Sequence, residues 1–545
     1  MSLVTVQDNK SSSLGSYYTN RFKRLKYSRA NWDEHWDDVA RYFLPRQNNI
    51  YGFREKGERK HQDIYDSTGI HSVETLASAL HSTMTSSSNV WFGLSSGDRE
   101  LDKVPEIRAW LQEAVLRMID VLNDSNFQTQ IHETYLNIVS AGTSVLYMED
   151  GDKERVINFR SSPIYPFYVA TDNWKRVNTV MCSYEYSYSQ MVDEFGEDVI
   201  PDDIKMNAQS DVAKTYKIVH TVEKNRKIYK DQPNIKSTNL PWVSVYVLDK
   251  TDTVLKVKGY REFPYAVPRW SVINEEDYGR SPAMKALPDV KMLNAMKKVV
   301  IRGAQKVIEP AVTLPDNGYL LPLDLTPGGV NFKRPGVENI EPIYAGANPG
   351  IGLDIMQETH LRVEQAFFID QLHLREADRM TTVEVMQRRE EYLRVLGPIL
   401  GRLDDELLRP IVKRTFGIMW RKKLFTPPPQ QLSDRELRVE YVSQIAKAQK
   451  ATEADTFLRV VQSIGPMVEL DPGLMQNFDG DKLIRHNARI FGLPEEVMRD
   501  EGKLAQMREQ QAKQQQAMMQ SEMNKNNADA AKSQAEAENV GKPTA

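Results

Sequence analysis

Four basic side chains at regular spacing within one predicted helix are the clearest chemical signal in this sequence. They are Lys291, Lys298, Arg302 and Lys306, which stand seven, four and four residues apart. This spacing keeps all four on one stripe of a helix. By periodicity alone, such a stripe is most often a solvated face opposite a core face, and the alternative is a surface that faces phosphate groups. One such helix would bind DNA weakly, whereas the same helix repeated around a ring would form stacked positive rings.

The motifs that usually carry catalysis or bind a cofactor are missing. The sequence contains no G-x-x-x-x-G-K-[ST] loop, no H-E-x-x-H and no G-x-S-x-G. Gly350 and Gly352 lack the third glycine of a dinucleotide loop. The nine histidines show no ligand spacing, and the single cysteine, Cys182, cannot form an intrachain disulfide. We therefore expect no enzymatic activity, no metal site and no cofactor.

The composition of the chain limits its function class. The 545 residues include 71 basic and 75 acidic side chains, a net charge of -4. This balance excludes a uniformly basic nucleic-acid binder but not one with local stripes of cations. No window approaches 18 consecutive apolar residues, and the polar first 20 residues lack the apolar stretch of a signal peptide. We expect a soluble chain without membrane insertion, made in a reducing compartment.

Helical periodicity precedes a β-rich region along the chain. One helix is predicted through Phe22, Leu25, Trp32, Trp36, Val39 and Phe43, with Arg29 at an odd register position. Further helices follow the cap-like Asp66-Ser67-Thr68, begin at Pro105, and span about 125–139. Period-two patterns then predict a hairpin over 143–160 and strands over 180–188, 216–222, 243–248 and 254–257.

The chain returns to helix after residue 281. Pro282 is suited to the first helical position, and Pro288 either restarts or kinks the helix that runs to residue 309. Its core face is predicted to hold Val290, Leu293, Met296, Val300, Ala304, Val307 and Ile308. A compact Pro/Gly-rich segment (311–349), a helix (350–368), a polar stretch (370–381) and a proline-kinked helix with leucines from 393 to 407 follow. After residue 503 the Gln-rich composition predicts a disordered or solvated helical tail.

The first predicted helix carries a charge pattern that opposes its dipole. Its first half is basic and its second half acidic: Arg21, Lys23, Arg24, Lys26 and Arg29, then Asp33, Glu34, Asp37 and Asp38. Cations near a helix start and acids near its end are mildly unfavourable in isolation. The pattern indicates either an ordinary solvated face or partner residues elsewhere, on this chain or on a neighbouring subunit.

Several short stretches, taken in order, resemble one known family. They are Trp32-Asp33-Glu34 through Tyr42-Phe43-Leu44-Pro45, Tyr65-Asp66-Ser67-Thr68-Gly69, Leu80-His81-Ser82-Thr83-Met84-Thr85, Tyr278-Gly279-Arg280-Ser281-Pro282-Ala283 and Met380-Thr381-Thr382-Val383-Glu384-Val385. The sequence is similar, over about residues 15–500, to the portal, or head-to-tail connector, proteins of short-tailed, T-seven-like podoviruses. None of these stretches is a catalytic signature, so the specificity comes from their order.

The resemblance implies an α+β portal fold that assembles as a ring. It implies a wing (1–280), a stem helix (281–310), a clip (311–349), a second stem helix (350–369), a tunnel loop (370–381), a kinked wing helix (382–429), a mostly helical crown (430–502) and a flexible or helical tail (503–545). It also adds His373, Arg375 and Arg379 of the tunnel loop to the four stem cations as candidates that face DNA. The stem stripe faces either the channel or a neighbouring subunit.

The function implied by the resemblance is a non-enzymatic conduit for double-stranded DNA at the unique vertex of a phage capsid. The partners implied are eleven further copies in a homododecamer, the terminase large subunit, tail adaptor and tail tube proteins, major capsid and scaffold proteins, and possible internal core proteins. The protein would reside in the virion, and in the host cytoplasm during assembly. The alternatives are another structural virion protein, internal or scaffold-like, and an enzyme of unrecognised type.

Overall fold

The computed structural model falls into two compact units. One consists of residues 1–97 and 110–441, and the other of residues 98–109 and 442–545. The structure describes residues 8–45, 62–98, 100–152, 154–210, 214–225, 240–313, 319, 322–324, 330–336, 338–343, 349–372, 395–433, 440–443 and 501–540. The mixture of helices and sheets confirms the predicted α+β class, whereas the boundaries of the implied regions stay predictions.

The first predicted helix is in fact two helices, α1 (Asp8–Ser28) and α2 (Ala30–Phe43), so the prediction of one continuous helix is wrong. The break falls at Arg29, whose side chain is buried. Its guanidinium donates hydrogen bonds to the carbonyls of Ile164, Tyr165 and Phe167. A buried cation needs such acceptors. The chain therefore turns at Arg29, where a helical stripe alone gave no reason for a break.

Three further helices precede the sheets: α3 (Thr68–Met84), α4 (Pro105–Asp124) and α5 (Phe127–Ala141). The expected cap of α3 is provided by Asp66, whose Oδ1 accepts a hydrogen bond from the Thr68 amide at 3.0 Å. Helix α4 begins at Pro105 as predicted, and its core-facing side chains Ile107, Leu111, Ala114, Met118 and Leu122 are all buried.

A small sheet continues from α5. Strands β2 (Ser144–Asp150) and β3 (Ile157–Pro163) form the predicted antiparallel hairpin, and β9 (Tyr265–Ala266) pairs with the other edge of β2. The shorter elements β1 (Phe92–Ser95), η2 (Leu101–Lys103) and η3 (Glu197–Val199) connect larger ones.

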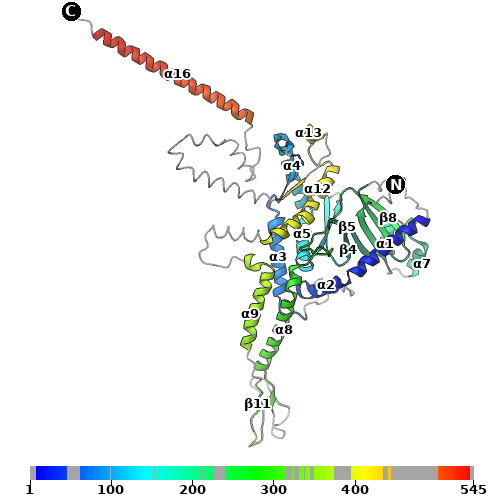
Figure 1. The fold of residues 1–545 in the computed structure, drawn as a ribbon. Helices are drawn as coiled ribbons and strands as arrows, with labels where there is room; N and C mark the ends of the chain where they lie inside the picture. Colours follow the sequence, from blue (N-terminus) through cyan, green and yellow to red (C-terminus); the bar gives the residue numbers. More distant parts are fainter. Residues whose placement is uncertain are drawn as a thin grey trace, which may run out of the picture. The chain divides into compact units, whose positions relative to one another are not determined.

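A five-stranded antiparallel sheet in the order β4-β5-β6-β7-β8 forms the largest β element of the described residues. Its strands are β4 (Phe167–Thr171), β5 (Val177–Ser187), β6 (Thr215–Lys224), β7 (Trp242–Leu248) and β8 (Thr253–Tyr260). The last four were expected from period-two patterns, whereas β4 was not. Helix α1 crosses one face of this sheet (Figure 1). The short helices α6 (Tyr188–Phe195) and α7 (Asp202–Ser210) pack on the other face.

Two long helices lie side by side after the sheets (Figure 1). They are α8 (Pro282–Ile308) and α9 (Pro349–Ala366), so both predicted helices are confirmed within two residues at each end. Helix α8 runs through Pro288 as one element. Between them, β10 (Val312–Thr313) pairs with β11 (Glu341–Pro342), and the short α10 (Ile369–Leu372) follows α9.

The predicted proline-kinked helix is described from residue 395. Residues 395–403 are helical, a π-helical turn covers Asp404–Leu408, and α12 spans Arg409–Arg421. The irregularity at this end is therefore the π turn immediately before Pro410, and such turns accommodate an extra residue in a helix. Residues 373–394 lie outside the described residues.

The remaining described elements are short or belong to the tail. They are α13 (Gln430–Ser433), β12 (Glu440–Ser443) and α16 (Glu501–Val540). The tail is thus a helix of 40 residues, which agrees with the second of the two predicted alternatives. Most of the crown predicted over 430–502 lies outside the described residues.

Candidate functional site

Helix α8 carries the predicted cation stripe, and its first turn is anchored by hydrogen bonds. The Ser281 hydroxyl accepts from the Met284 amide at 3.0 Å and donates to the Ser140 carbonyl at 2.7 Å. Pro282 occupies the first turn, where a missing amide proton costs nothing. A helix of 27 residues is about 40 Å long. The local sequence therefore fixes where the stripe begins and how far it extends.

The first two cations of the stripe are engaged by other parts of the same chain. Lys291 Nζ lies 2.8 Å from a carboxylate oxygen of Asp38 and 5.7 Å from the centre of the Tyr42 ring. Lys298 Nζ lies 5.2 Å from the centre of the Tyr65 ring. Both contacts are on partly exposed surface, where they contribute modestly to stability. They nevertheless orient these two side chains toward α2 and the segment before α3.

The last two cations of the stripe differ from the first two. Arg302 and Lys306 are exposed, and neither has an ion-pair partner among the described residues. The structure therefore divides the predicted stripe into an engaged pair and an accessible pair. Lys297, which the seven-four-four spacing passes over, adds a partly exposed cation beside Lys298.

The core face predicted for α8 is only partly correct. Val290 and Leu293 are buried, but Val307 and Ile308 are exposed to 53% and 78%. The second half of α8 and the neighbouring α9 together expose a set of large apolar side chains: Val299, Ile301, Val307, Ile308, Leu353, Ile355 and Leu361. Val307 and Ile308 belong to the core face that periodicity predicts, yet within the described chain they remain exposed.

A polar junction fixes the segment before α3 to both long helices, and sequence reasoning missed it. Asn294 of α8 accepts a hydrogen bond from the Tyr65 amide at 2.6 Å and donates to the Asp63 carbonyl at 3.0 Å. His360 of α9 lies 2.9 Å from the Thr68 hydroxyl and 3.4 Å from a carboxylate oxygen of Asp66. No local sequence signal marks these contacts, because their partners are more than 200 residues apart.

His373, Arg375 and Arg379 of the predicted tunnel loop all lie outside the described residues. Their proposed contact with DNA remains a prediction from the resemblance.

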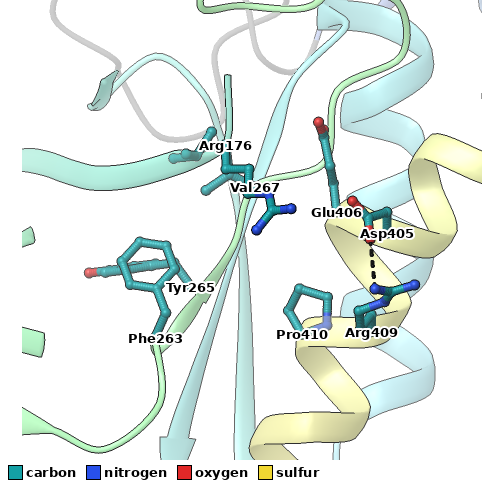
Figure 2. Close-up of a pocket in the computed structure, with 9 residues that line it drawn as sticks. Arg176, Phe263, Tyr265, Val267, Asp405, Glu406, Arg409 and Pro410 are labelled. Carbon is teal, nitrogen blue, oxygen red and sulfur yellow. Dashed lines mark ion pairs between the residues drawn. The ribbon is translucent and has the colours of Figure 1, made fainter. Parts of the chain in front are cut away.

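A pocket of about 270 Å³ lies beside the π-helical turn (Figure 2). Figure 2 shows the rings of Phe263 and Tyr265 on one side of the pocket and Asp405, Glu406 and Arg409 on the other. Both acids are paired, because Asp405 lies 3.3 Å from Arg409 and Glu406 lies 2.6 Å from the buried Arg269. The Glu406–Arg269 pair holds the helix against the segment after β9, whereas Asp405 and Arg409 lie one turn apart on the same helix. Neither carboxylate is an unpaired general acid or base.

The single cysteine is in contact with a histidine, a combination that forms a nucleophile in some enzymes. Cys182 Sγ lies 3.8 Å from His220 Nδ1, and His220 Nε2 lies 2.9 Å from the Ser244 hydroxyl. Burial raises the pKa of the Cys182 thiol to about 12 and lowers the pKa of His220 to about 3. Both groups are therefore neutral at neutral pH, unlike the thiolate and imidazolium of a reactive pair. Their role here is packing.

Neither a metal cluster nor a bilayer-spanning helix is found in the part of the chain that the structure describes. No group of three or more His, Cys, Asp or Glu residues could hold a metal ion there. None of the described helices combines the length and apolar character needed to cross a bilayer.

The comparisons with known proteins agree on one class of relative. The "Probable portal protein" of Bordetella phage BPP-1 is 30% identical over 533 residues, which cover 94% of each chain. The "Portal protein" of Salmonella phage epsilon15 is 29% identical and covers 91% of this chain and 90% of its own. The "Portal protein" of Escherichia phage T7 is 20% identical over 72% of each chain, so the T-seven-like assignment has weaker support than the portal class.

Solved structures add only a distant likeness. One chain of "Virion of native gene transfer agent (GTA) particle" matches 76% of this chain and 92% of its own, with 12% identity and a TM-score of 0.35. A family model described as "Bacteriophage head to tail connecting protein" matches residues 16–498. Because that match spans most of the chain, this protein belongs to the bacteriophage head-to-tail connecting protein family.

Proposed function

We propose that this chain is a phage portal protein, which forms the channel for double-stranded DNA at one vertex of the capsid. The observation that carries the proposal is the family match over residues 16–498, together with relatives called portal proteins over more than 90% of the chain. Portal proteins are structural components of the virion and not enzymes. The paired carboxylates of the pocket and the neutral Cys182–His220 contact agree with a structural role.

Self-association is supported by the exposed apolar side chains of α8 and α9. Seven large apolar side chains stay exposed there, and exposed apolar patches of this kind mark protein–protein contacts. On this proposal the faces of neighbouring copies cover one another as the stem of a ring, and twelve copies close the ring. The segments 281–310 and 350–369 are then the stem, 311–349 the clip and 1–280 most of the wing.

Contact with DNA is proposed for the accessible end of the stripe. Arg302 and Lys306 are exposed, so a ring would present them as two positive layers. Weak contacts to phosphate suit a duplex that must slide, because tight binding would stall it. Lys291 and Lys298 have neighbours within the chain, and the proposal therefore gives them a smaller part. His373, Arg375 and Arg379 remain further candidates.

The proposal includes partners that a DNA channel at a capsid vertex requires. The terminase large subunit would dock during packaging, and tail adaptor and tail tube proteins would bind afterwards, through the clip. Major capsid, scaffold and internal core proteins would surround the wing and crown. The protein would assemble in the host cytoplasm and remain in the virion.

Two measurements test this function. Light scattering should give a mass near twelve copies of the 62.5 kDa chain, about 750 kDa. A stable monomer at micromolar concentration would contradict the ring. For the channel, Arg302→Glu with Lys306→Glu should leave the ring intact and reduce DNA packaging or retention in particles.

A matched control for the channel experiment is Lys413→Glu with Lys423→Glu, which makes the same charge change at exposed positions on and after α12. This control should package normally. Equal packaging by the stem variant and the control would remove the stem cations from the channel while leaving the ring in place.

A further inference from the structure

Helix α1 packs one side on the five-stranded sheet and presents a basic side to solvent. Tyr18 and Phe22 are buried against Val219, Val243 and other residues of one sheet face. Residues 16–28 contain four basic residues and no acidic residue. The helix is therefore firmly held by its apolar side, while its opposite side carries an unbalanced positive charge.

Most of this positive charge has no ion-pair partner within the described chain. Arg21 forms an ion pair with Glu223, but Lys23, Arg24 and Lys26 are exposed and form no ion pair with described residues. Tyr27 stands beside them and is 87% exposed. Tyrosine and arginine are enriched on surfaces that bind another protein. We call Lys23, Arg24, Lys26 and Tyr27 the α1 face.

The opposite face of the same sheet carries the complementary charge. Helices α6 and α7 pack there through Met191, Phe195 and Ile204, against Ile218 and Leu248. Residues 188–203 hold six acidic residues and no basic one. Glu194 is occupied by Lys256, and Asp202 lies 3.3 Å from Lys205. The other four, which we call the α6–α7 acids, are exposed: Asp193, Glu197, Asp198 and Asp203.

Strand register shows that these two surfaces cannot meet within one copy. Val219 faces α1 and its neighbour Ile218 faces α6–α7, because successive side chains of a strand point to opposite faces. Complementary surfaces on opposite sides of one molecule are the requirement for a head-to-tail contact, which closes into a ring when the rotation fits. We propose that the α1 face of one copy binds the α6–α7 acids of the next copy.

Charge indicates that the partner of the α1 face is a second copy of this chain. The chain itself supplies an acidic surface that matches the α1 face, and none of its four acids forms an ion pair with a described residue. Nucleic acid on the α1 face would leave the α6–α7 acids uncovered. The inference rests on the ring of the proposed function and adds a contact between neighbouring sheets to the contact between stems.

Reciprocal charge reversal tests the contact. Variant B carries Lys23→Glu, Arg24→Glu and Lys26→Glu, and variant A carries Glu197→Lys, Asp198→Lys and Asp203→Lys. Reversing three exposed pairs should weaken each contact by roughly 10- to 100-fold, so each variant alone should shift from rings to smaller species. An equimolar mixture should recover rings of alternating copies, and so should a single chain that carries both sets.

A control separates net charge from position. Lys513→Glu, Lys525→Glu and Lys532→Glu change the net charge as variant B does, but on α16, and should leave rings unchanged. Unaltered circular dichroism shows that each variant is folded. If variant A and variant B each form rings without the other, as the wild type does, the proposed contact is wrong although the protein still assembles as a ring. A loss of rings that neither mixing nor combination restores would also overturn it, and a monomeric wild type would overturn both proposals.

Discussion

Replacing Arg29 by methionine should destabilise the protein strongly. Arg29 is 2% exposed and donates to three backbone carbonyls of residues 164–167. It also lies 2.7 Å from Asp33 as an ion pair without the geometry of a hydrogen bond, and 3.7 Å from the centre of the Tyr168 ring. Removing one partner of a buried charged pair costs about 3–5 kcal/mol. The loss of three hydrogen bonds to carbonyls, at about 1 kcal/mol each, gives a similar value.

A urea titration followed by tryptophan fluorescence measures this loss. Trp36 is a suitable reporter because the Arg29 guanidinium lies 5.5 Å from the centre of its ring. Lys413→Met, at an exposed position of α12, is the control and should change the unfolding free energy by less than about 0.5 kcal/mol. A loss below about 1 kcal/mol for Arg29→Met would refute the argument that this side chain holds the break between α1 and α2.

The loss should also depend on pH. Burial raises the pKa of Asp33, and the neighbouring Arg29 opposes that shift. Without Arg29 the pKa of Asp33 should rise further, so the folded state holds a proton that the unfolded state releases above pH 4 or so. Stability of the variant then falls as pH rises through this window. The difference from wild type should be smaller at pH 4 than at pH 7, and an equal difference would contradict the assigned role of Asp33.

Three further outcomes are expected. Burial lowers the pKa of His220 to about 3, so the free energy of unfolding of the wild type should fall by up to about 1.4 kcal/mol per pH unit below pH 6.5. Urea titrations at pH 7 and 5 should show that His220→Gln loses this dependence. Gly142→Ala should lower the free energy of unfolding by about 2–4 kcal/mol, because φ is +78° and a Cβ would lie 2.1 Å from a carbonyl oxygen. Gly303→Ala, which has open space around it, should stabilise α8 slightly. Asn294→Ala should cost about 1–2 kcal/mol and accelerate amide exchange of residues 63–66, and unchanged exchange would contradict the junction.

Local patterns predicted the elements that are stabilised locally. The start of α8 followed from Ser281 and Pro282, and the β2–β3 hairpin followed from period-two alternation around Gly151. These signals depend on capping and turn chemistry within a few residues. The cation stripe could also be predicted locally, because the spacing of its four residues alone places them on one side of α8.

Contacts between distant residues could not be predicted in the same way. Arg29 fits a helical register, and only the carbonyls some 135 residues later explain why the chain turns there. The engaged half of the stripe depends on Asp38, which is 253 residues from Lys291. Periodicity also shows that α8 has an apolar face, but not whether the same chain or another copy covers it. Val307 and Ile308, for example, lie on the predicted apolar face of α8 but are exposed in the single chain.

The base of α8 has a mechanical consequence. The Gly142 and Gly279 backbones are in direct contact. The Thr143 hydroxyl accepts a hydrogen bond from the Gly279 amide, and the Ser281 hydroxyl donates one to the Ser140 carbonyl. This clamp leaves little freedom for α8 to pivot at its root. For a rod about 40 Å long, a tilt of about 5° displaces the far end by about 3–4 Å. Small rotations of the sheet region would therefore be magnified at the tip, and a sideways force on the tip would strain the clamp.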